Sequence, residues 1–75
     1  MMMKVQARAL KEIKEIADKR YVVQDGKFDA GYHVRWSFDS ITEAYRHYES
    51  INTGRAFKKR LVDTKTGEIL ERYLS

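Results

Sequence analysis

The sequence predicts a small α+β domain with the element order α-β-β-α-β-β, in which two hairpins form an antiparallel sheet of about four strands. Three patterns lead to this prediction. Apolar residues recur at helical spacing in residues 5–17 and 41–51, and they alternate with polar residues in residues 28–38. Glycine-containing turn sequences mark two hairpins. At 75 residues, the chain is expected to be one domain that covers residues 1–75.

The first predicted helix covers residues 5–17. Its apolar stripe consists of Val5, Ala9, Leu10, Ile13, Ile16 and Ala17. Its other face carries opposite charges four residues apart, such as Arg8 and Glu12, so we expect that face to be exposed to solvent.

A β-hairpin is predicted next. Asp25-Gly26 lies between β-forming residues and suits a type I′ turn, which would place Val23 opposite Phe28. A strict apolar–polar alternation then runs from Phe28 to Phe38 and predicts one long strand with a core face and a polar face. Gly31 is expected to mark a bulge that bends this strand.

The second helix and the second hairpin follow from capping and turn chemistry. The sequence of residues 40–43, Ser-Ile-Thr-Glu, fits a capping box, in which the Ser40 hydroxyl accepts the Glu43 amide and the Glu43 side chain returns to Ser40. Residues 52–54, Asn-Thr-Gly, supply a stop. The second hairpin is predicted from residues 55–62 and 68–74, joined by a type I turn that Gly67 closes.

Both helices are expected to pack on one face of the sheet. The residues expected beneath them are Phe28, Tyr32, Val34, Trp36, Phe38, Leu61 and Tyr48. The opposite face of the sheet would then remain open and polar.

The composition excludes several classes of protein. The chain has no cysteine, which excludes a disulfide framework, a thiolate metal site and thiol catalysis. Lys4 interrupts the N-terminal region where a signal peptide needs its apolar stretch, and no run of roughly 18 apolar residues occurs. We therefore expect a soluble, cytoplasmic protein that is not exported by an N-terminal signal and has no membrane partner.

Residues that could support catalysis do not occur in a diagnostic arrangement. His33 lies on the polar side of the long predicted strand, and His47 lies on the second helix without a partner at a diagnostic spacing. Ser40 is already explained as a helix cap, so a triad with Asp39 and His47 is not favoured. We expect no enzyme activity, no catalytic residue, no metal site, no cofactor and no small-molecule substrate.

Basic residues give the most informative charge pattern. The net charge is +4, and residues 1–20 and 53–75 each carry +3, whereas residues 21–52 carry −2. Residues 55–60, Arg-Ala-Phe-Lys-Lys-Arg, hold four cations and no acid. The hairpin register places Arg60 opposite Arg72, Lys59 opposite Tyr73 and Leu61 opposite Glu71. One face would hold Phe57, Leu61, Ile69 and Tyr73, and the other Lys58, Arg60, Arg72, Val62, Leu70 and Leu74.

Two arginines directly across a strand pair repel each other unless an anion or solvent separates them. The simplest explanation is an edge strand that lysines protect against unwanted pairing. The functional explanation is a basic sheet face that binds an anionic macromolecule, with nucleic acid ahead of an acidic protein surface. The residues expected at this site are Arg35, Lys58, Arg60, Arg72, Lys59, Arg55 and His33.

Two other classes of function remain open at this point. The protein could be a regulator or inhibitor, virus-encoded in one version, that covers a surface of a larger partner protein. Val62, Leu70 and Leu74 would then form an apolar centre with a basic rim. The third class is a homodimer, formed across a two-fold axis by the exposed edge of the long strand or by the second hairpin with its mixed apolar face.

Overall fold

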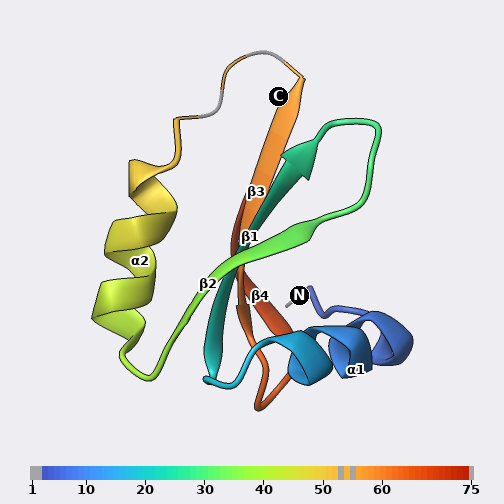
Figure 1. The fold of residues 1–75 in the computed structure, drawn as a ribbon, viewed down its shortest axis with the longest axis vertical. Coiled ribbons are helices and arrows are strands. Elements are labelled where there is room, and N and C mark those ends of the chain that lie inside the picture. Colours follow the sequence, from blue (N-terminus) through green and yellow to red (C-terminus); the bar gives the residue numbers. More distant parts are fainter. Residues whose placement is uncertain (1–2, 53, 55, 75) are drawn as a thin grey trace.

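The structure is a computed structural model that describes residues 3–52, 54 and 56–74. Its elements are α1 (Ala7–Ile16), β1 (Tyr21–Lys27), β2 (His33–Phe38), α2 (Ile41–Ser50), β3 (Phe57–Asp63) and β4 (Glu68–Leu74). The four strands form one antiparallel sheet in the order β2-β1-β3-β4 (Figure 1). The predicted α+β class, the element order and the antiparallel sheet are therefore confirmed.

The two helices cover opposite faces of the sheet, so the prediction that both lie on one face is wrong (Figure 1). Val22 packs in a cluster with residues of α1, whereas its neighbour Val23 packs with residues of α2. On β3, Val62 belongs to the α1 cluster and Leu61 to the α2 cluster. Successive residues of a strand point to opposite faces, so these adjacent, fully buried apolar pairs require cover on both sides.

The predicted turn at Asp25-Gly26 is also wrong. Both residues continue β1, and the connection to β2 is formed by residues 28–32. Val23 pairs with Trp36 rather than with Phe28, which is 55% exposed and not in the core. The long predicted strand is therefore shortened to β2.

The bulge in this hairpin lies at Arg35 and not at Gly31. The register shifts between Val23 and Gln24, whose partners are Trp36 and Val34, so Arg35 is the extra residue. Its guanidinium donates to the Asp25 carboxylate at 3.0 Å. This contact holds β1 in strand geometry through the predicted turn.

Gly26 has a different role from the one its turn signal suggests. A Cβ atom at this position would lie 2.4 Å from the carbonyl oxygen of Gly31. The absence of a side chain therefore allows the connection between β1 and β2 to fold back onto β1.

Replacing Gly26 by alanine is expected to lower the free energy of unfolding by about 1 kcal/mol, because the backbone of the connection must move away from the new methyl group. Urea unfolding followed by the fluorescence of Trp36 measures this loss. The control is Gly31→Ala, where a Cβ meets nothing within 4 Å and the expected change is small. Equal stability of the two variants would contradict the close approach.

The first helix is shorter than predicted and is preceded by a strand-like segment. Val5 is buried, and its amide donates to the Gly67 carbonyl at 2.8 Å. The Ile69 amide in turn donates to the Met3 carbonyl, also at 2.8 Å. Residues 3–5 thus extend along the beginning of β4. Neither helix in the part of the chain that the structure describes is long and apolar enough to cross a membrane.

The turn of the second hairpin agrees with the prediction, whereas only one of the two hydrogen bonds predicted for the cap of α2 is formed, because the Glu43 side chain binds Arg46 and not the Ser40 amide. The Ser40 hydroxyl accepts the Glu43 amide at 3.3 Å, while the Glu43 carboxylate accepts a hydrogen bond from Arg46. Gly67 has a φ of 81° and donates its amide to the Asp63 carbonyl at 2.7 Å. This left-handed conformation is the one that favours glycine at the end of such a turn.

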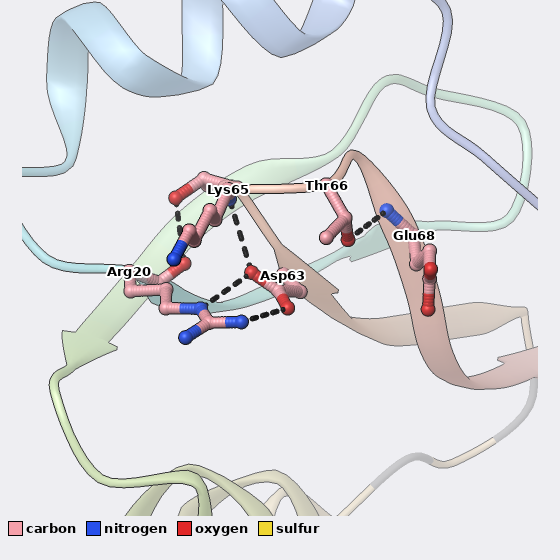
Figure 2. Close-up of polar contacts among 6 residues, drawn as sticks. Arg20, Asp63, Lys65, Thr66 and Glu68 are labelled. Carbon is pink, nitrogen blue, oxygen red and sulfur yellow. Dashed lines mark hydrogen bonds and ion pairs between the residues drawn. The ribbon is translucent and has the colours of Figure 1, made fainter.

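A polar network ties the beginning of β1 to this turn (Figure 2). The Arg20 guanidinium donates from Nε and Nη2 to the two carboxylate oxygens of Asp63, at 2.9 and 2.8 Å. The Lys65 amide donates to the same carboxylate at 3.0 Å, and the Thr64 hydroxyl donates to the Arg20 carbonyl at 2.7 Å. The hydrogen bonds from the Arg20 guanidinium, and after them the one from the Lys65 amide, lower the pKa of Asp63. The groups of this network satisfy one another, which is typical of a structural site.

Candidate functional site

The predicted pairing of two arginines across the second hairpin is confirmed. Arg60 of β3 pairs with Arg72 of β4, and Lys58 pairs with Leu74. Side chains of paired residues lie on the same face of a sheet, so Arg60 and Arg72 are neighbours.

The prediction for the turn end of this hairpin is wrong in one respect. Beyond Leu61 the register shifts by one residue, so Val62 pairs with Ile69 and Leu70 is the extra residue of a bulge. Ile69 therefore packs in the α1 cluster and Leu70 in the α2 cluster, opposite to their predicted sides.

Lys58, Arg60 and Arg72 form what we call the basic face. They lie on the α1 side of the sheet, since Arg60 shares this side with Val62 two residues along β3. Helix α1 crosses only the end of the sheet that carries the β3–β4 turn (Figure 1). The basic face lies on the other half of this side, which α1 leaves uncovered.

Tyr32 lies against two residues of the basic face, Lys58 and Arg60, and not in the core, where it was predicted. The guanidinium carbon of Arg60 is 3.9 Å from the centroid of the Tyr32 ring, and Nζ of Lys58 is 4.4 Å from it. Lys58 also donates to the Ala30 carbonyl. The electron-rich ring offsets part of the repulsion between the two cations.

Arg60 is held from a second direction by Gln24. Its Nε donates to Oε1 of Gln24 at 2.7 Å, and the Gln24 side chain is buried in the sheet. Burial lowers the pKa of Arg60 from its ordinary value, which still leaves the guanidinium charged at neutral pH. The sequence contains a signal for this contact: Gln24 directly follows the apolar residues 21–23 of β1, and a buried amide needs a partner.

No carboxylate in the described part of the chain lies within ion-pair distance of the basic face. The ion pairs among these residues involve Arg20, Arg35 and Arg46, together with a 4.0 Å contact of His47 with Glu43. The positive charge of the basic face is thus held by an aromatic ring, an amide and a carbonyl group rather than by acids.

Three other predicted site residues, Arg35, His33 and Lys59, do not join the basic face. Arg35 is paired with Asp25 and lies over the ring of Trp36, on the α2 side. His33 is exposed and pairs with Asp25 in the sheet. Lys59 is buried, with Nζ donating to the carbonyls of Tyr48 and Ile51 at 2.8 and 3.3 Å. Arg55 lies outside the described residues.

The described residues include the basic face and hold no cluster of three or more His, Cys, Asp or Glu side chains suited to a metal ion. What this surface can do chemically is to bind anions, since charged guanidinium and ammonium groups donate hydrogen bonds to phosphate and carboxylate oxygens. No protein-family model, curated protein or solved structure matches this chain.

Proposed function

We propose that this protein is a non-enzymatic binding module whose basic face contacts the phosphate backbone of a nucleic acid. The observation that carries the proposal is the direct pairing of Arg60 and Arg72. Among the described residues no carboxylate lies within ion-pair distance of Arg60 or Arg72, so an external anion relieves the repulsion between these two side chains.

The arrangement of the cations favours an extended chain of anions over a single acidic group. Lys58 and Arg60 are two residues apart on β3, so their Cα atoms are separated by about 6.6 Å along the strand. Arg72 extends the row sideways onto β4. Such a row can contact successive phosphates, and phosphate contacts bind all sequences alike.

Replacing Lys58 or Arg60 by alanine is expected to weaken binding of a labelled oligonucleotide for every base sequence. Each change should reduce the slope of log affinity against log salt by about one, because one fewer phosphate is neutralised. Fluorescence anisotropy across a salt series measures both quantities. The control is Lys65→Ala, which removes the same charge from the β3–β4 turn at the other end of β3.

The proposal fails if the double variant K58A/R60A binds as well as the parent protein at every salt concentration. It also fails if Lys65→Ala reduces the salt slope as much as Lys58→Ala does. That result would mean that net charge alone attracts the nucleic acid.

A protein partner is the second candidate, and the exposed apolar side chains favour it. Phe28, Phe57, Tyr73 and Leu74 are each at least 40% exposed, and strand pairing brings them to the same end of the sheet. Exposed apolar residues beside a basic surface are typical of a protein interface. In this case a partner protein captured from cell lysate stays bound after treatment with nuclease and with salt. Leu74→Ser should reduce the amount captured, whereas K58A/R60A should not.

A further inference from the structure

A groove lies beside the basic face, between α1 and neighbouring residues of the sheet and of the β1–β2 connection. Its volume is about 230 Å³, and its walls include Ala9, Ile13 and Ile16 of α1 on one side and Tyr32, Val34 and Arg60 on the other. Arg60 belongs both to this groove and to the basic face. A ligand that enters the groove therefore stays in contact with the phosphate-binding surface.

The groove is lined by apolar side chains and by two side chains of opposite charge. Ile16 is 72% exposed, although it lies on the apolar stripe of α1, so much of its surface remains to be covered. Arg60 supplies a positive charge, and Glu12 of α1 supplies a negative one. An occupant with an anionic group and a flat apolar body would complement this arrangement.

Arg60 is prepared for a ligand before the ligand arrives. Gln24 accepts the hydrogen bond from Nε, and the guanidinium rests on the ring of Tyr32. The two terminal nitrogens are the donors that a phosphate uses in a two-point contact. Because the side chain is already held in place, little conformational freedom is lost on binding.

From this geometry we propose that the groove accepts one unpaired nucleotide, with its phosphate on Arg60 and its base against Ile13, Ile16 and Val34. Glu12 sets the orientation, because its carboxylate repels the phosphate and accepts a hydrogen bond from a base amino group. The inference rests on the proposed function and adds to it that the preferred ligand is a single strand. A base in a duplex is stacked and paired and cannot enter the groove without being extruded.

The test compares a short oligodeoxycytidine strand with an abasic strand of equal length, since cytosine carries an amino group that can reach Glu12. The parent protein is expected to bind the cytidine strand about tenfold more tightly, from apolar surface buried in the groove. Ile16→Gln should reduce affinity for the cytidine strand and leave affinity for the abasic strand unchanged. Ile41→Gln, at an exposed apolar residue of α2, is the control and should change neither.

Equal affinity of the parent protein for the two strands would overturn the groove proposal. If that affinity still fell with salt and with K58A/R60A, the proposed function would stand without the groove. An unchanged cytidine affinity in Ile16→Gln would also overturn the groove proposal. If the parent protein bound neither strand, the proposed function itself would be contradicted.

Discussion

Replacing Lys59 by alanine is expected to lower the free energy of unfolding by about 3 kcal/mol, although its neighbours Lys58 and Arg60 belong to a surface site. Lys59 is only 9% exposed, and its ammonium group donates to two carbonyls at the end of α2. The same group lies 4.3 Å from the centroid of the Tyr48 ring. Its removal takes one hydrogen bond from each of these two carbonyls, although the Tyr48 carbonyl keeps the Ile51 amide as a donor, and it opens a gap between α2 and β3.

The measurement is urea unfolding of the parent protein and the variants at neutral pH. Lys59→Met should lose less stability than Lys59→Ala, because its unbranched side chain still fills the space over Tyr48. Lys58→Ala should cost little stability and reduce oligonucleotide affinity, whereas Lys59→Ala should do the reverse at temperatures where it remains folded. A Lys59→Ala variant as stable as Lys58→Ala would contradict the capping role.

Burial raises the pKa of Tyr48 to about 12, so its ring remains neutral beside the ammonium group of Lys59 well above neutral pH. The contact is therefore one between a cation and a neutral aromatic ring. This supports the assignment of Lys59 to the α2 side of the sheet.

The difference between Lys58 and Lys59 shows which parts of the site the sequence could predict. The Gly67 turn was predictable from the local sequence, but the register next to it differs by one residue from the prediction, and only the bulge at Leu70 restores the predicted pairing of Arg60 with Arg72. The use of Lys59 depends on where α2 docks, which is set by contacts distant in the sequence. Alternation along the strand places Lys59 and Lys58 on opposite faces of the sheet, but it does not indicate that the end of a helix lies above Lys59.

The prediction of the helix arrangement failed although the sequence carried a usable signal. Strict alternation in residues 28–38 favoured a sheet with one open face, but this segment became an edge strand and a loop. The two central strands instead contain adjacent apolar pairs, Val22-Val23 and Leu61-Val62. Consecutive apolar residues are typical of strands that are covered on both faces. In a sheet of this size the central strands are a better guide to the layers than the longest alternating run.

The Asp25-Gly26 turn failed for another reason. The dipeptide is favourable for a turn, but its two residues make separate tertiary contacts. The Asp25 carboxylate binds Arg35, and the absence of a side chain at Gly26 leaves room for the backbone of Gly31. Neither partner can be identified from the local sequence. Turn propensity was therefore overridden by contacts that form only when β2 is in place.

Replacing Asp63 by asparagine is expected to lower the free energy of unfolding at neutral pH by about 2 kcal/mol, which is typical of a hydrogen-bonded charged group. The change preserves the shape of the side chain but removes its charge. It also presents an amide group where the Arg20 guanidinium needs an acceptor (Figure 2). Glu71→Gln, at an exposed carboxylate of β4, is the matched control and should have little effect.

The dependence of this loss on pH follows from the lowered pKa of Asp63. The hydrogen bonds from Arg20 hold the folded-state pKa below the ordinary value of 3.8, so the folded protein resists protonation more than the unfolded chain does. The stabilisation from Asp63 is therefore complete above this ordinary value and decreases as the pH falls through the folded-state pKa. Urea unfolding at a series of pH values should show the parent protein losing stability on acidification more steeply than Asp63→Asn.

A double-mutant cycle with Arg20→Gln separates the ion pair from the other hydrogen bonds of Asp63. If the pair acts as a unit, the combined variant loses less stability than the sum of the two single losses. The loss that Asp63→Asn still causes when Arg20→Gln is already present then reports the contact of Asp63 with the Lys65 amide, which the Arg20 change leaves in place. Additive losses, or an acid dependence in Asp63→Asn as steep as that of the parent protein, would show that this ion pair does not hold β1 to the β3–β4 turn.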